Sequence, residues 1–316
     1  MFEKKYDTVR GEAALVVSGV GHIDLYDTFE CGQAFRYELL VREEGYLEYM
    51  TVIRDRLVRV GQRTPGELVF YGINDSELEE IIAPYFALAT DFEEIRRRII
   101  SSTDSDWLKR AAEEAKGIVI LKQDPWETIF SFIISQNNNI PRIRKIIRAM
   151  SAAYGENLAQ KQGLKICPVG LIDGCPSDDR CRECGRCYSF PTPGAVAESP
   201  EKMLPSKPGF RYKYLLSAAE KVLSREVDID EIAKKCDYDY TVAQLKKISG
   251  VGDKVASCAA LFGFSNLDAF PIDVWMRRAI DEYFGGRLDT STLAGYAGVA
   301  QQYIFHYVRN LESKEK

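Results

Sequence analysis

The sequence lacks any stretch that is long and apolar enough to cross a membrane. Its first residues, from Met1 to Asp7, also lack the apolar core of a signal peptide. We find neither an internal repeat nor a low-complexity tail. These absences lead us to expect an intracellular, cytoplasmic protein that has no membrane partner.

The chain also lacks a net positive charge, because 42 lysines and arginines face 47 aspartates and glutamates, for a formal charge of −5. This argues against a protein that coats nucleic acid without specificity. Basic residues still gather locally, and a solvated helix face explains any single cluster about equally well. Together, the clusters flank a glycine hairpin and an asparagine run, which favours phosphate contacts; they are Arg142, Arg144, Lys145, Arg148, Arg211, Lys213, Lys246, Lys247, Lys254, Arg277 and Arg278.

A chain of 316 residues can hold two domains of ordinary size. Residues 45–55, 56–60 and 67–71 read as strands separated by turn residues, so we predict an antiparallel sheet in the first third. After Ser76 the apolar period becomes helical, through Leu78, Ile81, Ile82 and Tyr85.

From about Asp124 the sequence indicates helices alone, including a segment around Phe130 that is apolar on every side and should be buried. We therefore predict an α+β protein with a sheet domain and flanking helices over 1–123 and an all-helical domain over 124–316. A cysteine-rich insert at about 160–190 interrupts the helical part.

The segment Ile248-Ser249-Gly250-Val251-Gly252-Asp253-Lys254 predicts a tight glycine hairpin that ends at the start of a helix. The free N–H groups there favour an anion such as phosphate. The same positive helix end disfavours a charged lysine, so we expect Lys254 to be a usable nucleophile. A phosphate-binding or surface lysine is the alternative.

Asp273 follows in Pro271-Ile272-Asp273-Val274, just before another helical segment. Aspartate at this position is a good helix N-cap, and a capping carboxylate is also well oriented for chemistry. Taken with the hairpin, Asp273 is a candidate catalytic carboxylate.

Two pairs at i and i+4 add candidate pocket residues. Cys258 lies one turn after Lys254, so an amine and a thiol face one space, although a small core cysteine is the simpler interpretation. Gln301 and Phe305 form the second pair, in which an amide can read a purine edge and a ring can stack on it. Without the other motifs this pair would be an ordinary amphipathic helix.

These motifs resemble, in order and spacing, those of 8-oxoguanine DNA glycosylases of the eukaryotic type, members of the helix-hairpin-helix Gly/Pro-Asp superfamily. The resemblance covers most of the chain outside the insert, and it rests on the hairpin together with CGQAFR at 31–36, QDP at 123–125, SQNNNIPR at 135–142 and PGFRYKY at 208–214. A lysine at the position of Lys254 marks the superfamily members that also cut the DNA strand.

The resemblance implies a role for each matched residue. Gly32 would accept the N7 hydrogen of 8-oxoguanine through its carbonyl, Cys258 and Phe305 would sandwich the flipped base, and Gln301 would read its pairing edge. The residues implied in holding the orphaned cytosine and the DNA are Asn137, Arg142, Phe210, Arg211, Gly250 and Gly252. Two positions depart from the family: Phe210 stands where a tyrosine is usual, and Trp275 where a histidine is common.

The implied reaction is base excision by Lys254 and Asp273, with a Schiff base and β-elimination and without a catalytic cofactor. The implied partner is double-stranded DNA that contains an oxidised guanine opposite cytosine, bound by a monomer at the nucleoid. A monofunctional alkylpurine glycosylase is one alternative, and Lys254 argues against it because that class lacks the lysine. A noncatalytic hairpin-based DNA-binding protein is the other, and it would not need Asp273 or the pocket residues.

Five of the eight cysteines fall within the insert, which in an intracellular chain suggests a metal rather than disulfides. Cys181-Arg182-Glu183-Cys184-Gly185 has the form of a zinc knuckle, and Cys187 and Cys167 complete a set of four thiols, with Cys175 as the alternative to Cys167. We favour a structural zinc over an iron–sulfur cluster, whose cysteine spacing and place in related enzymes differ. Reduced thiols in a loop are the third interpretation.

Overall fold

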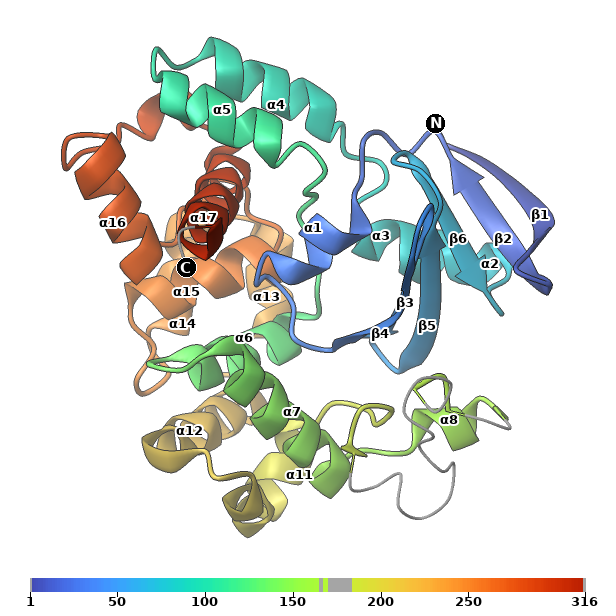
Figure 1. Cartoon of the computed structure of the whole chain (residues 1–316). Helices are drawn as coiled ribbons and strands as arrows, with labels where there is room; N and C mark the ends of the chain where they lie inside the picture. Colours follow the sequence, from blue (N-terminus) through green and yellow to red (C-terminus); the bar gives the residue numbers. More distant parts are fainter. Residues whose placement is uncertain (1, 165–166, 170–183, 315–316) are drawn as a thin grey trace.

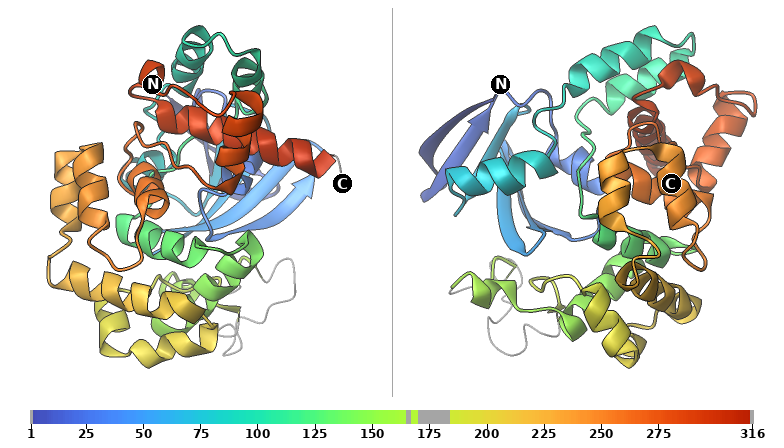
Figure 2. Two further views of the ribbon diagram at one scale, coloured as in Figure 1. Left: turned by 90° about the vertical axis from the view of Figure 1, so that its left-hand side faces the viewer. Right: turned by 180° about the vertical axis from the view of Figure 1, so that it is seen from behind.

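The computed structural model describes residues 2–164, 167–169 and 184–314. A six-stranded sheet lies on one side of the molecule and most helices lie on the other (Figure 1). The two views of Figure 2 show the same division from the side and from behind. The N-terminus lies beside the sheet, and the chain ends at the helix α17 among the helices.

The sheet is antiparallel throughout, with the strand order β1-β2-β6-β5-β4-β3. The predicted strands are confirmed as β4, β5 and β6, whereas β1, β2 and β3 were not singled out from the sequence. The strands are β1 (Glu3–Val9), β2 (Glu12–Ser18), β3 (Tyr37–Glu43), β4 (Tyr46–Ile53), β5 (Arg56–Gln62) and β6 (Glu67–Tyr71).

Strand β4 alternates poorly in sequence because both of its faces are covered. Tyr49 and Ile53 pack with the core beneath α1 and α3, while Met50 and Val52 pack with residues of the insert. The first face is closed by α1 (Leu25–Glu30), the π-helical turn η1 (Leu78–Ile82) and α3 (Ala83–Tyr85), and the short helix α2 (Asp75–Glu77) leads into η1; in that order along the chain they are α1, α2, η1 and α3. A capping box between Asn74 and Glu77 starts the last three of these.

The remaining helices form a second hydrophobic core. They are α4 (Phe92–Ser101), α5 (Asp106–Glu114), α6 (Pro125–Ser135), α7 (Ile140–Tyr154), α8 (Leu158–Lys161), α11 (Pro193–Glu198), η2 (Pro200–Ser206), η3 (Gly209–Arg211), α12 (Tyr212–Leu223), α13 (Ile229–Lys235), α14 (Tyr238–Leu245), α15 (Asp253–Phe262), α16 (Val274–Tyr283), η4 (Ser291–Leu293) and α17 (Ala297–Lys314). Although α4 and α5 precede residue 124, their apolar residues belong to this core, against α17.

Local signals start the helices that carry the site. Asp124 caps α6 with Pro125 in its first turn, and the apolar run of α6 is buried as predicted. Asn139 caps α7 in the same way, with Pro141 in the first turn. The glycine hairpin joins α14 to α15, which confirms the predicted helix-hairpin-helix.

Between α7 and α11 the chain forms the short helix α8 and an isolated bridge between Asn157 and Tyr188. This part of the insert packs on β4 and β5, and Gln162 bonds both the N–H and the carbonyl of Leu57. The predicted ligands Cys175 and Cys181 lie outside the described residues.

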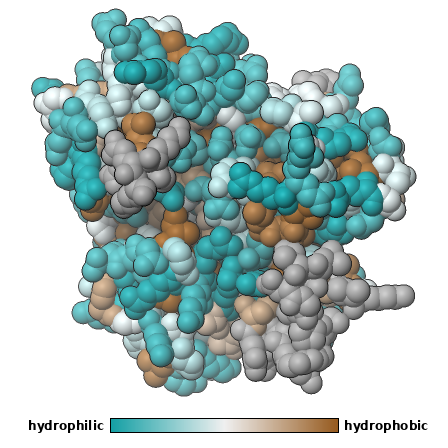
Figure 3. Space-filling model, viewed as in Figure 1, coloured by the Kyte–Doolittle hydropathy of each residue, from teal (hydrophilic) through white to brown (hydrophobic). Residues whose placement is uncertain are grey.

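Among the described helices, none combines the length and the apolar character that crossing a bilayer requires. On the face seen in Figure 1, hydrophilic residues predominate, and hydrophobic residues form patches between them (Figure 3).

Candidate active site

One cavity of about 400 Å³ collects the predicted catalytic and base-pocket residues. They reach it from four elements that are far apart in sequence: the loop after α1, the helix α15, the start of α16, and α17. The cavity is lined by Gly32, Lys254, Cys258, Asp273, Gln301 and Phe305, together with residues of α6 and the asparagine run. A space of this size suits a small ligand such as a single base.

The hairpin delivers Lys254 to the second position of α15. Gly250 has a φ of +78°, and a Cβ there would lie 2.5 Å from ring atoms of Tyr214, so the turn requires glycine. The Lys254 Nζ donates to Ser135 Oγ at 3.2 Å and lies 5.2 Å from the ring centroid of Phe132. The amine is therefore held by one hydroxyl against an aromatic wall of the cavity.

Cys258 follows one turn later with its side chain buried. Burial raises the pKa of the Cys258 thiol, and the nearby Lys254 opposes the rise. The thiol therefore stays protonated at neutral pH, and Cys258 serves as a wall of the cavity instead of a nucleophile.

Asp273 is the N-cap of α16, where its Oδ1 accepts the Met276 N–H at 2.9 Å. The same carboxylate lines the cavity. The capping bond fixes its orientation, so the structural and the chemical interpretations of Asp273 are compatible.

The loop after α1 places Gly32 opposite α17. Gly32 has a φ of +85°, and a Cβ there would approach side-chain atoms of Phe305 and Arg309 to 3.5 Å. The loop is anchored by the buried Gln33, which donates to the carbonyls of Thr28 and Val119 and accepts the N–H of Leu121. These bonds give the Gly32 peptide a fixed place beside the cavity.

The residues predicted to meet the opposite strand lie outside this cavity, on exposed loops and helix starts. Asn137 is exposed in a left-handed conformation with a φ of +47°, and Arg142 is exposed in the first turn of α7. Gly252 lies next to Lys254 in an adjoining groove that Asn137 also lines. Phe210 is 51% exposed despite its apolar ring, as a wedge residue requires.

Arg211 differs from the expectation that it contacts the cytosine. Its side chain is only 2% exposed, and its guanidinium donates to the carbonyls of Pro208, Gln136 and Asn137. Four of the five N–H donors of arginine are used in these bonds. In this structure Arg211 therefore supports the loop that carries Asn137, and a direct contact with cytosine requires some of these bonds to open.

Among the other residues that line the cavity, Ser135, Gln302 and Arg309 had no role assigned from the sequence. Ser135 stands in the SQNNNIPR motif, and Arg309 follows Phe305 by one helical turn, so spacing held a signal for both. Arg309 Nη1 donates to the carbonyl of Glu30 at 3.3 Å, which links α17 to the end of α1. Trp275, the departure noted from the sequence, also lines the cavity.

The cysteines of the insert are brought together only in part. Cys167 and Cys187 are buried with their Sγ atoms 2.8 Å apart, and Met50 Sδ of β4 lies 3.9 Å from Cys187 Sγ. Cys184 is half-buried. Within the described ranges, no group of three or more His, Cys, Asp or Glu residues is arranged to hold a metal ion. Of the four expected ligands, Cys167 and Cys187 therefore lie together, and a complete four-cysteine site is not formed within the described ranges.

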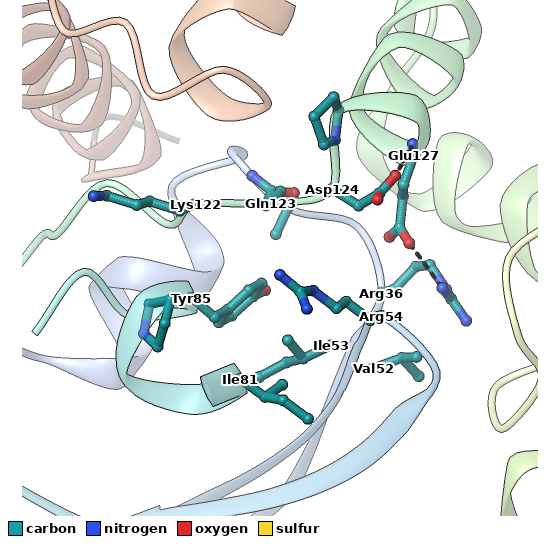
Figure 4. Close-up of a pocket in the computed structure, with 13 residues that line it drawn as sticks. Arg36, Val52, Ile53, Arg54, Ile81, Tyr85, Lys122, Gln123, Asp124 and Glu127 are labelled. Carbon is teal, nitrogen blue, oxygen red and sulfur yellow. Dashed lines mark hydrogen bonds and ion pairs between the residues drawn. The ribbon is translucent and has the colours of Figure 1, made fainter. Parts of the chain in front are cut away.

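A smaller cavity of about 110 Å³ lies between the sheet and the start of α6, and none of the predicted site residues lines it. Figure 4 shows Arg36 and Glu127 pointing toward one another at its edge, with their ion pair at 2.9 Å. This cavity belongs to the junction between the sheet and the helices.

Comparisons with known proteins agree with the geometry. The family model described as 8-oxoguanine DNA glycosylase, N-terminal domain, matches residues 16–129. The structure of MBOgg1 in complex with a low-affinity DNA ligand is 31% identical, with a TM-score of 0.79 over 98% of this chain and 99% of that one. The Clostridium acetobutylicum 8-oxoguanine glycosylase/lyase, in complex with DNA containing cytosine opposite 8-oxoG, is 30% identical, with a TM-score of 0.79 over 99% and 98% of the two chains.

Among curated proteins, the Saccharomyces cerevisiae N-glycosylase/DNA lyase is 26% identical over 276 residues, or 80% of this chain. The chain spans 66% of the length of that yeast protein.

Proposed function

The chain belongs to the 8-oxoguanine DNA glycosylase/lyase family, and we propose that it removes 8-oxoguanine opposite cytosine from duplex DNA and then cuts the strand. The observation that carries this proposal is the convergence of an amine, a carboxylate and a base-sized cavity: Lys254 and Asp273 line the same space as the base-reading candidates. A mere DNA-binding hairpin would need no such cavity.

Recognition begins when the lesion leaves the stack, at a cost of roughly a few kcal/mol. The exposed ring of Phe210 can fill the gap, since stacking needs the ring and not the hydroxyl of the usual tyrosine. The flipped base would lie between Cys258 and Phe305, with its N7 hydrogen donated to the carbonyl of Gly32 and its pairing edge against Gln301. Guanine lacks the N7 hydrogen, so this carbonyl would distinguish the lesion.

The orphaned cytosine would be held by Asn137 and Arg142, with Arg211 buttressing the Asn137 loop and reaching the base if its carbonyl bonds open. The arginine fork of Arg142 suits the acceptor atoms of cytosine. Gly250 and Gly252 would bring backbone N–H groups of the hairpin to a phosphate.

The chemistry would proceed through the neutral amine of Lys254. Its lone pair attacks C1′ of the sugar as the bond to the oxidised base breaks, and the carboxylate of Asp273 stabilises the positive charge that develops on the sugar. Ring opening gives a Schiff base between Nζ and C1′. Loss of a proton from C2′ then expels the 3′ phosphate by β-elimination.

Borohydride trapping tests the proposal directly, because borohydride reduces a protein–DNA Schiff base to a stable cross-link. The substrate is a duplex with one 8-oxoguanine opposite cytosine, and an undamaged duplex is the control. We expect a lesion-dependent cross-link that is absent in Lys254→Gln, while that variant still binds the damaged duplex.

Full strand cleavage by Lys254→Gln would refute the role of the lysine. Release of free base without a cross-link would indicate a monofunctional glycosylase. If the folded protein gives neither a cross-link nor free base, the remaining interpretation is a noncatalytic DNA-binding module.

We also propose that the enzyme acts as a monomer on the DNA of the nucleoid.

We further propose that a structural zinc binds the insert. The zinc proposal is supported by the pairing of Cys167 with Cys187, which lie on either side of the insert's central residues in the sequence. Elemental analysis of untagged protein should give about one zinc per chain, lost in Cys187→Ser and kept in Cys236→Ser, a control at an exposed cysteine. A zinc content near zero in the unmodified protein would remove the proposal.

A further inference from the structure

Gln302 occupies an unusual position beside the proposed base pocket. It follows Gln301 on α17, is only 4% exposed, and lines the same cavity. Its Nε2 donates to Gln301 Oε1 at 2.9 Å. Its own Oε1 is buried and finds no hydrogen-bond donor among the described residues.

A buried amide oxygen without a donor has lost its hydration and gained nothing in return, so such atoms are rare in folded proteins. Gln302 lines a cavity, so a turn of its amide, whose oxygen is buried here, would present this acceptor to a donor of the ligand. Here the cavity is the one that holds Lys254 and Asp273, so that ligand is the flipped base.

The bond between the two amides also fixes what each can offer. With Gln301 Oε1 held by Gln302, the Nε2 of Gln301 remains a donor, while Gln302 Oε1 remains an acceptor. The pairing edge of a guanine presents the O6 acceptor, the N1 hydrogen and the exocyclic N2 amino group. One amide can pair with two neighbouring positions of this edge, so the third calls for a second side chain.

We propose that Gln302 is a further specificity-determining residue, whose Oε1 accepts a hydrogen bond from the N2 amino group of the flipped base. Gln301 then donates its Nε2 hydrogen to O6, and its Oε1, which accepts from Gln302 with one lone pair, accepts the N1 hydrogen with the other. This inference rests on the proposed glycosylase function and extends it to the part of the base that distinguishes guanine from purines lacking N2. A base without that amino group leaves the Gln302 oxygen buried and unpaired, which penalises its binding.

The test compares two lesions, 8-oxo-2′-deoxyguanosine and 8-oxo-2′-deoxyinosine, each opposite cytosine in the same duplex. The inosine analogue lacks only the N2 amino group, and it pairs more weakly with cytosine, which by itself makes flipping easier. For the unmodified enzyme we expect single-turnover excision of the analogue to be roughly 10- to 100-fold slower, the loss typical of one buried hydrogen bond.

The matched variant is Gln302→Met, which keeps the length of the side chain and removes its amide. We expect this variant to excise 8-oxoguanine more slowly and to excise the inosine analogue at nearly the same rate as the unmodified enzyme. The ratio of the two excision rates should therefore approach one. If Gln302 only supports Gln301, both rates fall together and the ratio is preserved, which would overturn the inference.

The unmodified enzyme gives an independent answer if Gln302→Met does not fold. Equal excision of both lesions by that enzyme would overturn the inference and leave the glycosylase proposal intact. No excision of 8-oxoguanine at all would overturn the proposed function, and this inference with it.

Discussion

Asp273 combines a structural bond and a proposed chemical role in one carboxylate. Its capping bond to the Met276 N–H holds the group in place, and its position at the cavity allows it to face the reacting sugar. The two roles depend on different properties, because the cap needs an acceptor oxygen and the chemistry needs a negative charge.

The substitution Asp273→Asn separates these properties, because asparagine caps helices as well as aspartate does. We expect the melting temperature to stay close to that of the unmodified protein. Base release should fall by roughly 10²- to 10³-fold, the usual effect of losing one preorganised electrostatic group. Single-turnover kinetics and thermal unfolding measure the two outcomes.

Asp91→Asn is the control, since Asp91 caps α4 through the same kind of bond to the Glu94 N–H and does not line the cavity. It should change neither quantity appreciably. A large loss of thermal stability in Asp273→Asn with unchanged base release would restrict Asp273 to capping.

At the scale of elements, the position of Lys254 depends on how α14 and α15 meet. The hairpin between them packs its first glycine on Tyr214, whereas the second lies in open space at the start of α15. The two glycines are therefore required to different degrees.

We expect Gly250→Ala to destabilise the protein by about 1–3 kcal/mol, because the new methyl group meets the Tyr214 ring and the φ of +78° disfavours alanine. Gly252→Ala should cost less than about 1 kcal/mol, since a Cβ there meets nothing within 4 Å and φ is negative. Urea unfolding of both variants measures the difference. Equal losses would show that Tyr214 does not constrain the turn.

A second element contact joins the two walls of the proposed base pocket. The helix α1 meets α17 through Arg309 with the carbonyl of Glu30, and through His306, whose Nε2 lies 3.6 Å from Asp27 Oδ1. Burial raises the pKa of Asp27 to about 6, with a smaller contribution from Asp24. Burial lowers the pKa of His306, so the imidazole is neutral at pH 7.

These shifts predict how Asp27→Asn changes stability with pH. The folded protein binds the Asp27 proton more tightly than the unfolded chain, so this carboxyl group costs stability as the pH rises from about 4 through 6. Removing the charge should stabilise the fold by on the order of 1 kcal/mol at pH 7, a value reduced for the solvent that reaches the group. The gain should shrink as the pH falls toward 4, where the folded protein is protonated at Asp27 and the unfolded chain is partly protonated.

Urea unfolding of the two proteins at pH 7 and pH 4.5 provides the measurement. A variant that is less stable at pH 7 would show that the Asp27 charge stabilises the junction.

At the scale of the whole molecule, one buried ion pair joins the sheet, the helices and the insert. Arg36, just before β3, bonds Glu127 of α6 (Figure 4). It also donates to the carbonyl of Tyr188. Burial raises the pKa of the Glu127 carboxyl, and the charge of Arg36 opposes that rise. Since Gly32 is carried by the sheet side, this junction also supports the proposed base pocket.

Replacing Arg36 with Met should cost about 3–5 kcal/mol, because it leaves the Glu127 carboxylate buried without its partner. The double variant Arg36→Met/Glu127→Leu should recover a large part of that loss. Chemical denaturation of the single and double variants gives the coupling energy, which we expect to exceed about 1 kcal/mol. Strictly additive losses would mean that the pair is not coupled in the fold.

Features that depend on neighbouring residues follow from the amino-acid sequence alone. The strands β4, β5 and β6, the buried apolar run of α6 and the glycine turn before Lys254 follow from local patterns, and the structure contains them as predicted. The residues expected to line a base pocket do line one cavity, because the family pattern already carried that long-range information.

Which distant groups meet depends on how the folded chain packs. It buried the Arg211 guanidinium against carbonyls of the asparagine loop, packed α4 and α5 on α17, and paired Cys167 with Cys187. It also placed Ser135 beside Lys254 and left the Gln302 oxygen buried without a donor among the described residues. No local pattern encodes these contacts, because each depends on the approach of segments that are far apart in the chain and on which polar atoms remain without partners once they have packed.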